Sequence, residues 1–285
     1  MPPRNQPTAR QVRLGTELRR LRDAAGMTAR DVAQFLGSTS AQMSQMEAGI
    51  AGVSEKRLRR LAAHYACADE ALIDGLVEMA ADRTRGWWEE YAQVLPPVFG
   101  DLAELEHHAR FMQVIATAHV PGLLQTEDYA RAVLSYRVPE LPDSELEPRL
   151  THRMRRKSVL SREGAPPYEA VVHESALRTR VADRRVARAQ LDELLRASER
   201  PNVSVRVIPF DVDGFAGASS MMLYAGGQVT ALDTVQRDAP YGSVFLDASA
   251  QLLAMRTLFR KVEAASLEPA KSRDFMHRLA KEIQS

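Results

Sequence analysis

Apolar residues recur at helical spacing through the first eighty residues, and glycines and short polar residues interrupt them at short intervals. The first such stretch ends at Gly26, and glycine readily takes the left-handed conformation that follows a helix. Its apolar positions, three or four residues apart, are Leu14, Leu18, Leu21 and Ala25. The pattern predicts an arginine-rich helix that stops at this glycine.

A second, shorter helix is predicted between Thr28 and Gly37. Thr28 is followed three residues later by Asp31, which is a capping-box pattern, and Gly37 provides the next stop. The apolar stripe between them consists of Val32, Phe35 and Leu36. Its short length fits the first helix of a helix-turn-helix.

The third predicted helix begins with Thr39 or Ser40 as its cap. It buries Met43 and Met46, which are three residues apart, while small neutral side chains fall on its other faces. Such side chains suit the major groove, because Gln can form two hydrogen bonds with adenine, Ser can bond to several base edges and Ala can contact a thymine methyl. The succession of elements therefore predicts a helix-turn-helix that enters the major groove of DNA.

Residues near the start of a recognition helix reach the base edges in this architecture. Gln42 is the first choice for reading bases, and we expect further base contacts from the exposed residues around it. Thr28 and Arg30 are expected to contact phosphates. The predicted DNA-binding residues are Thr28, Arg30, Thr39, Ser40, Ala41, Gln42, Ser44 and Gln45.

Two further helices complete the predicted N-terminal domain. Ser54 can cap one of them, and Asp69 with Glu70 opens the other. Five helices would then form a DNA-binding domain over residues 1–85. Positive charge supports this assignment, since residues 1–60 contain eleven Arg or Lys and five Asp or Glu, whereas the whole chain has a net charge of only +1.

From residue 86 onward the pattern becomes a mixture of helices and strands. Helical spacing predicts helices at 101–118, 127–134, 144–161, 184–198, 246–264 and 269–283. Apolar and alternating runs predict strands at 168–173, 203–208, 219–224, 229–234 and 241–245. Because the strands after residue 200 follow one another without helices between them, we expect an α+β domain over residues 86–285 with an antiparallel sheet.

The composition is that of a globular chain able to bury a sizeable core. The 285 residues are 45% hydrophobic and 26% charged, and Cys67 is the single cysteine, which excludes an internal disulfide and cysteine-based zinc modules. No apolar run approaches the roughly 20 residues that span a bilayer, and the first residues lack the apolar stretch of a signal peptide. We therefore expect a cytoplasmic, nucleoid-associated protein.

No catalytic or metal-binding pattern is found among the titratable residues. His107 and His108 are neighbours on a predicted helix, where successive side chains diverge by about 100 degrees, so they cannot chelate one metal together. The motifs of zinc proteases, serine hydrolases and nucleotide-binding loops are also missing. We expect no enzymatic activity, no metal and no cofactor.

A basic run in the stretch 144–161 is the strongest charged feature outside the first domain. It comprises Arg153, Arg155, Arg156 and Lys157. Such a run is usually a solvated helix face, and the alternatives are contact with an acidic partner or with additional phosphates. We take the four residues as candidates for partner binding.

The segment 36–49, Leu-Gly-Ser-Thr-Ser-Ala-Gln-Met-Ser-Gln-Met-Glu-Ala-Gly, resembles the recognition segment of xenobiotic-response-element-type (Cro/C1-type) repressors. It departs from that pattern at three kinds of position. Ser38 replaces an apolar residue, Met43 and Met46 replace isoleucines, and Ala48 stands where a basic residue is common. The core pattern is intact.

The second half resembles one group of such regulators. The matching segments include Val-Pro-Gly-Leu-Leu-Gln-Thr at 120–126, Arg-Met-Arg-Arg-Lys at 153–157 and Val-Arg-Val-Ile-Pro-Phe at 205–210. They are similar to the effector domain of antitoxin-like transcriptional regulators of the Scr1 and WhiJ type, abundant in Streptomyces and other actinomycetes. The resemblance covers about residues 87 to 280. It implies a DNA-binding regulator, often encoded beside a small partner protein.

Together these features predict a sequence-specific transcriptional regulator that binds a double-stranded DNA operator. One helix-turn-helix covers only a half-site, so a homodimer is expected. The C-terminal domain would receive a protein or small-molecule signal. The alternative is an antitoxin-like module that holds a small neighbour-encoded protein and autoregulates its operon.

Overall fold

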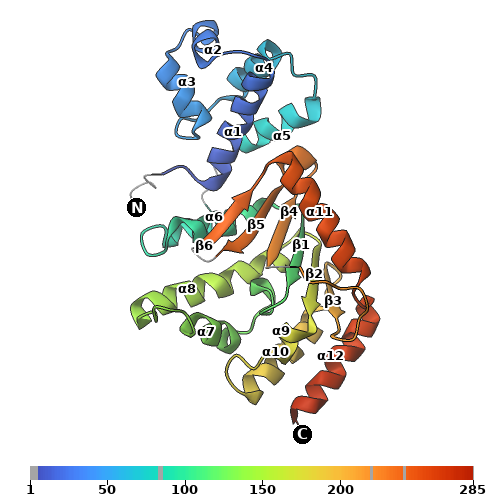
Figure 1. The fold of residues 1–285 in the computed structure, drawn as a ribbon. Helices are drawn as coiled ribbons and strands as arrows, with labels where there is room; N and C mark the ends of the chain where they lie inside the picture. The colour runs from blue at the N-terminus through green and yellow to red at the C-terminus, as the bar shows by residue number, and fades with distance from the viewer. Residues whose placement is uncertain (1–5, 83–85, 219–220, 240–241, 285) are drawn as a thin grey trace. The chain divides into compact units, whose positions relative to one another are not determined.

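The chain forms two compact units in the computed structural model, which describes residues 6–82, 86–218, 221–239 and 242–284 (Figure 1). Unit 1 comprises residues 1–105 and 228–232, and unit 2 comprises residues 106–227 and 233–285. The predicted domain boundary between residues 85 and 86 adjoins residues 83–85, which lie outside the described ranges, and it stays a prediction.

Unit 1 contains the five helices that the sequence predicts in its first eighty residues. They are α1 (Ala9–Ala24), α2 (Ala29–Leu36), α3 (Ser40–Glu47), α4 (Glu55–His64) and α5 (Glu70–Ala81). Thr28, Thr39, Ser54 and Asp69 cap the last four of them through their side chains. Local sequence signals therefore set where these helices begin.

One apolar core joins these helices. Its most deeply buried members come from the first five helices and are Leu18, Val32, Met43, Leu58, Leu61 and Leu76. Val229 and Leu232, from the short segment that belongs to unit 1, also pack against this core. A 3₁₀ turn, Trp87–Tyr91, and the first part of α6 (Pro97–His108) complete the unit.

Unit 2 is built on a six-stranded sheet. The strands are β1 (Phe111–Ala116), β2 (Tyr168–His173), β3 (Val203–Ile208), β4 (Met222–Gly226), β5 (Thr234–Ala239) and β6 (Gly242–Leu246), and their order is β3-β2-β1-β4-β5-β6. The pairs β1–β2 and β2–β3 are parallel. The pairs β1–β4, β4–β5 and β5–β6 are antiparallel. The sheet is thus mixed, and the expected antiparallel sheet is wrong for its first three strands.

The connections explain the parallel half of the sheet. The helices of unit 2 are α7 (Glu127–Ser135), α8 (Asp143–Arg156), α9 (Glu174–Arg178), α10 (Arg184–Ala197), α11 (Ser249–Ala264) and α12 (Pro269–Gln284). α7 and α8 form the crossover from β1 to β2, and α9 and α10 form the crossover from β2 to β3. Parallel neighbours need such long connections, whereas antiparallel ones do not.

The incorrect prediction of the sheet arose in the stretch 101–118. Sequence spacing predicts one helix there, but α6 ends at His108 and β1 begins at Phe111. Met112, Ile115 and Ala116 fit one face of a helix, and they fit a strand buried on both faces equally well. The predicted strand 229–234 was also wrong, because residues 230–232 form a 3₁₀ turn and β5 starts only at Thr234.

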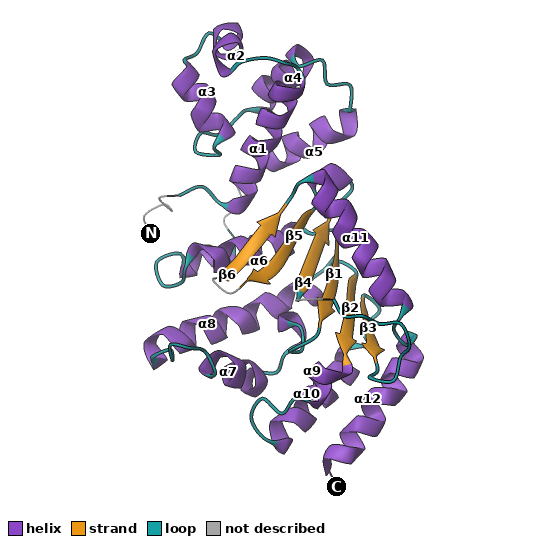
Figure 2. Ribbon diagram, viewed as in Figure 1, coloured by secondary structure: helices purple, strands orange, loops and turns teal. Residues whose placement is uncertain are grey.

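Helices cover both faces of the sheet, as Figure 2 shows, with α11 on one side and α7 with α8 on the other. On the α11 side, Leu252 and Phe259 pack against Ile115, Val171 and Tyr224. The outer edge of β3 is hydrogen-bonded to the segment before and at the start of α12. The Val207 amide donates to Ser272 Oγ at 2.9 Å, and the Val207 carbonyl accepts from the Leu267 amide at 2.8 Å. Within the described ranges, no helix is both long and apolar enough to cross a membrane.

Candidate nucleic-acid interface

Two short helices joined by a tight turn make up the predicted helix-turn-helix. α2 ends at Gly37, which has the left-handed φ of 64°, and Thr39 caps α3 two residues later. Thr39 Oγ1 accepts from the Gln42 amide at 3.2 Å, and Gln42 Oε1 accepts from the Thr39 amide at 3.1 Å. This reciprocal capping box fixes the residue at which α3 starts.

α3 separates its apolar and polar residues sharply. Met43 and Met46 are 0% and 4% exposed and lie in the core of unit 1. The remaining polar and small side chains of its first two turns are exposed, and they are Ser40, Ala41, Gln42, Ser44 and Gln45. The helix therefore presents an uncharged face to solvent, with no carboxylate on it to repel phosphates.

A buried ion pair holds the end of α3 against α1. Arg22 Nε donates to Glu47 Oε1 at 2.6 Å and Arg22 Nη2 donates to Glu47 Oε2 at 3.0 Å, while both side chains are less than 10% exposed. A third bond, from Arg22 Nη1 to the carbonyl of Met27 at 2.7 Å, reaches the turn before α2. Hydrogen bonding to Glu47 raises the pKa of Arg22 above its ordinary value, so Arg22 keeps its positive charge at physiological pH.

Two glycines allow the same elements to approach at backbone distance. A Cβ on Gly15 would lie 2.5 Å from the carbonyl oxygen of Glu47. A Cβ on Gly49 would lie 2.6 Å from the backbone of Gln11, and the φ of Gly49 is +75°. The ion pair and these contacts together make the position of α3 on α1 rigid.

The two glutamines of α3 differ in what their side chains already do. Gln42 uses Oε1 in the capping box, so a bidentate contact with adenine requires that bond to be released. Gln45 is exposed and its side chain bonds to none of the described residues. Its amide oxygen and nitrogen are both available. The spacing Thr39-x-x-Gln42 indicates this capping role of Gln42, which the sequence prediction did not include.

Thr28 and Arg30, the two residues predicted to contact phosphates, also differ in whether their side chains are already bonded. Thr28 Oγ1 donates to Asp31 Oδ2 at 2.6 Å, and this hydrogen bonding lowers the pKa of the Asp31 carboxyl. Arg30 is exposed and forms no ion pair with any residue in the described ranges. Arg30 can therefore reach a phosphate at no cost in internal bonds, whereas Thr28 would have to leave its cap.

Three residues of the basic run, at the end of α8 and directly after it, are bonded within unit 2. Arg156 binds Glu106 through two hydrogen bonds, of 2.8 and 2.5 Å, with side chains only 11% and 2% exposed. Lys157 Nζ donates to the Gln125 carbonyl at 2.7 Å and to Glu193 at 2.9 Å, and Arg153 Nη1 donates to Gln125 Oε1 at 3.0 Å. The role of Arg153, Arg155, Arg156 and Lys157 in partner binding stays a prediction.

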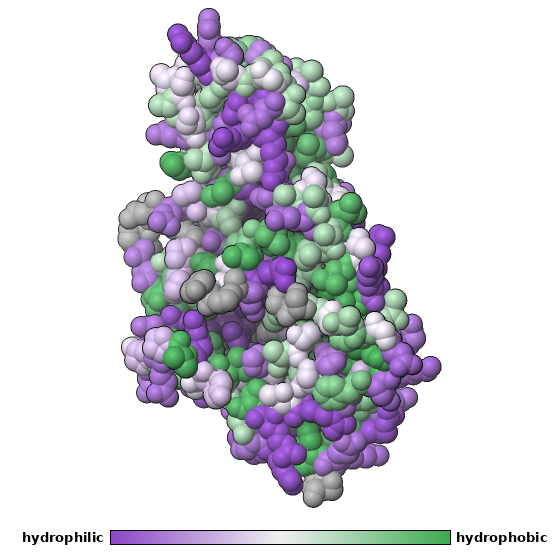
Figure 3. Space-filling view, viewed as in Figure 1, coloured by the Kyte–Doolittle hydropathy of each residue, from purple (hydrophilic) through white to green (hydrophobic). Residues whose placement is uncertain are grey.

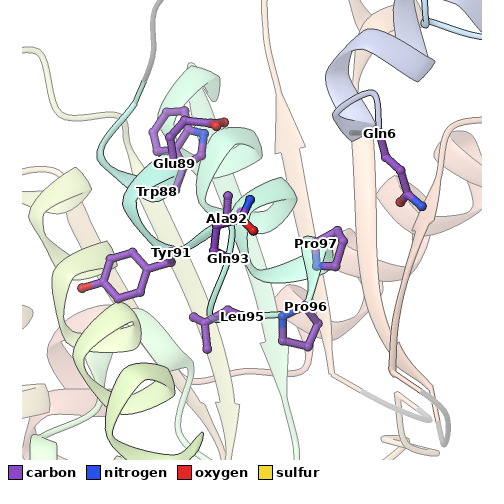
Figure 4. A pocket seen from close by; sticks show the side chains of 10 residues that line it. Gln6, Trp88, Glu89, Tyr91, Ala92, Gln93, Leu95, Pro96 and Pro97 are labelled. Atoms are coloured by element: carbon purple, nitrogen blue, oxygen red, sulfur yellow. The ribbon is translucent and has the colours of Figure 1, made fainter. Parts of the chain in front are cut away.

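A pocket of about 230 Å³ lies in unit 1 (Figure 4). Trp88 and Tyr91 line it from the 3₁₀ turn, Pro96 and Pro97 continue the wall, and Gln6 lies across from them. Ligand pockets usually measure about 300 to 1,000 Å³. The described part of the chain contains no group of three or more His, Cys, Asp or Glu placed to hold a metal. The exposed face of α3 is therefore the stronger candidate site.

Sequence reasoning missed Arg22 and Glu47, which position α3 without facing solvent. Their signal was weak, because each merely follows an apolar core position, Leu21 or Met46, in a helix rich in polar residues. Only the packing of α1 on α3 brings together two charges that are 25 residues apart.

Comparisons with known proteins gave two family matches. Residues 13–76 match a model described as a helix-turn-helix domain, which covers the surface described above. Residues 99–278, more than half of the chain, match a model described as a domain of unknown function (DUF5753). Neither the curated proteins nor the solved structures gave a match.

Proposed function

The chain belongs to the DUF5753 family, and from this membership and its helix-turn-helix domain we propose that it is a sequence-specific DNA-binding transcriptional regulator of the xenobiotic-response-element type. The observation that carries the proposal is the face of α3. It is exposed, uncharged and held rigidly on α1 by the Arg22–Glu47 pair. A preformed reading surface of this kind loses little conformational entropy on binding.

Gln45 is the principal base reader in this proposal. Its free amide can donate to N7 or accept from N6 of adenine without breaking an internal bond. Gln42, the first choice from sequence, contributes at most its Nε2 donor while the capping box is intact. Ser40, Ala41 and Ser44 line the same face and supply smaller contacts.

Two copies are expected to act together on the operator. A single recognition helix covers one half-site, so a homodimer would bind half-sites about 34 to 36 Å apart on a two-fold symmetric sequence. We further propose membership of the antitoxin-like regulators of the Scr1 and WhiJ type, with unit 2 as the part that receives a signal. If unit 2 instead holds a small neighbour-encoded protein, that protein will co-purify with the full chain from the native host.

The test starts from operators obtained by mapping chromosomal binding sites in the native host. We expect Gln45→Ala to weaken operator binding by roughly 10- to 100-fold, because one good base contact contributes about 1 to 3 kcal/mol of discrimination, and to leave non-specific binding unchanged. Gln34→Ala is the matched control, since Gln34 is an exposed glutamine on α2 with no side-chain bond among the described residues. Equal losses on operator and random DNA, or a larger loss for Gln34→Ala, would remove Gln45 as a reader.

A further inference from the structure

Arg153 differs from Arg156 and Lys157, two residues of the basic run that bind carboxylates. Arg156 is neutralised by Glu106 and Lys157 by Glu193. The guanidinium of Arg153 makes one bond, from Nη1 to the neutral amide oxygen Gln125 Oε1 at 3.0 Å, and no ion pair with any residue that the structure describes. An arginine carries five N–H donors, so most of its capacity is unused.

The unused donors of Arg153 are recessed but reachable. The residue is only partly exposed, yet none of its nitrogens is among the buried polar atoms that lack a bond. Burial, together with the charge of the nearby Arg156, lowers the pKa of Arg153 to about 10, while Asp238 and Glu106 act in the opposite direction. A desolvated cation without a counter-ion is expensive to keep, and functional sites are where such groups are found.

The surroundings of Arg153 are preorganised by a network of bonds. Gln125, the partner of Arg153 among the described residues, is itself fixed because its Nε2 donates to the Val120 carbonyl at 2.7 Å and its own carbonyl accepts from Lys157. The next residue, Thr126, is held by Gln190, whose Oε1 accepts from the Thr126 amide at 2.9 Å. A guanidinium fixed in this way loses little side-chain entropy when a ligand binds.

Charges around Arg153 limit what the site can accept. Asp238 on β5 lies within electrostatic range of Arg153 and of His119, and Figure 3 shows a hydrophilic hollow in unit 2 between α8 and the strands β5 and β6. Burial and the charge of Arg153 lower the pKa of His119, so its imidazole is neutral near pH 7. The site therefore has a surplus of at most one positive charge, which suits a monoanion better than a dianion.

We propose that Arg153 is the anchor of a binding site in unit 2 for a small monocarboxylate. The planar guanidinium matches a carboxylate through two parallel hydrogen bonds, and Gln125 keeps that plane fixed. Asp238 disfavours a second negative charge, which selects against phosphate dianions.

The binding site itself does not depend on DNA recognition, but its use as the signal input rests on the proposed function. Carboxylate binding would then change the affinity of the full chain for its operator. Failure of DNA binding would leave carboxylate binding intact, so the two ideas fail separately.

The first experiment measures thermal unfolding of the full chain in sodium acetate and sodium benzoate, with sodium phosphate and sodium chloride at equal ionic strength for comparison. We expect a saturable rise in the midpoint with at least one carboxylate, which Arg153→Gln abolishes. Arg185→Gln is the matched control, because Arg185 is an exposed arginine on α10 paired with Asp128 at 3.0 Å, and it keeps the rise. A response to phosphate alone, no saturable response to either carboxylate, or a rise that persists in Arg153→Gln overturns the proposal.

The second measurement separates a ligand-binding arginine from a structural one. Without added carboxylate, Arg153→Gln should unfold at the same midpoint as the wild type or a higher one, because it removes a recessed charge that forms no ion pair within the described ranges. A structural arginine would show the reverse, as Arg156 should. A variant that unfolds earlier or fails to fold therefore contradicts the proposal.

Discussion

α3 and α8 both carry runs of polar residues, and the two helices use them in opposite ways. On α3 the polar side chains from Ser40 to Gln45 stay exposed and uncharged, while the capping box at its start and Glu47 at its end are bonded. At the end of α8, Arg156 binds Glu106, and Lys157, the next residue, binds Glu193 within unit 2. The difference teaches that a polar run in a sequence does not specify whether it faces solvent, because the answer depends on partners far along the chain.

If this contrast is correct, the largest loss of stability will come from the charges of α8. Arg156→Gln leaves Glu106, only 2% exposed, as an unpaired buried carboxylate. We expect the free energy of unfolding to fall by about 3 to 5 kcal/mol. Urea unfolding of the full chain, followed by a probe in unit 2, measures it.

The control for Arg156 is again Arg185, whose pair with Asp128 is exposed. Arg185→Gln should cost at most about 1 kcal/mol. Adding Glu106→Gln to Arg156→Gln should restore part of the lost stability, since no buried charge remains. If both single variants cost the same, the burial of the α8 charges is not what stabilises unit 2.

Low pH should destabilise unit 2 through a buried histidine of the same helix, α8. His152 of α8 is 1% exposed, and burial together with the charges of Arg156 and Arg153 lowers its pKa to about 3 from an ordinary value of 6.5. Between these two pKa values the unfolded chain takes up a proton on His152 and the folded chain does not. The folded state therefore keeps its full stability above about pH 6.5 and loses stability as the pH falls towards 3. We expect unit 2 to be about 2 kcal/mol less stable at pH 5 than at pH 7 through this group, at roughly 1.4 kcal/mol per pH unit.

The pH effect is checked by urea unfolding at several pH values. His152→Gln should flatten the profile between pH 6.5 and 5, because glutamine takes up no proton. His277→Gln, at an exposed histidine of α12, should leave the wild-type profile unchanged. A profile that His152→Gln does not alter would assign the acid sensitivity to another group.

The core of unit 1 contains a buried polar atom whose removal should increase stability, in contrast to the buried charges of α8, whose removal should decrease it. Tyr65 is 5% exposed and its hydroxyl has no hydrogen-bond partner among the described residues, and burial with the nearby Glu47 raises its pKa to about 12. Tyr65→Phe keeps the ring and removes the desolvated oxygen. We expect the stability of unit 1 to stay equal or to rise by up to about 1 kcal/mol in urea unfolding. A fall of that size would mean that the hydroxyl is bonded in solution.

The sequence predicted unit 1 well because its signals are local. Thr28, Thr39 and Ser54 cap helices that begin within a residue or two of them, and Gly37 ends α2 by its own backbone conformation. The sheet was harder to predict. β1 is buried on both faces and so lacks the alternation that would distinguish it from a helix, and once it was misassigned the parallel pairing of β1, β2 and β3 could not be derived.

The candidate site shows the same division between local and distant information. The exposed face of α3 followed from two methionines three residues apart. The Arg22–Glu47 pair and the bonding of Arg156 to Glu106 join residues 25 and 50 positions apart, and no spacing rule connects them. Sequence identified which residues are polar, and tertiary packing decided which of them are available to a ligand.

Replacing Arg30 should give the smallest change in stability of these variants, and it compares an exposed arginine directly with the buried Arg156. It is exposed and forms no ion pair in the described part of the chain, so Arg30→Gln should change the stability of unit 1 by no more than about 0.5 kcal/mol. Its loss should appear only in DNA binding, where the slope of log affinity against log salt falls by about one for one phosphate contact. Arg59→Gln is the control, because Arg59 is an exposed arginine of α4 already bound to Glu55 and Asp74. An unchanged slope for Arg30→Gln would place this arginine off the DNA, and a destabilised unit 1 would show that exposure on α2 does not free a charge from a structural role.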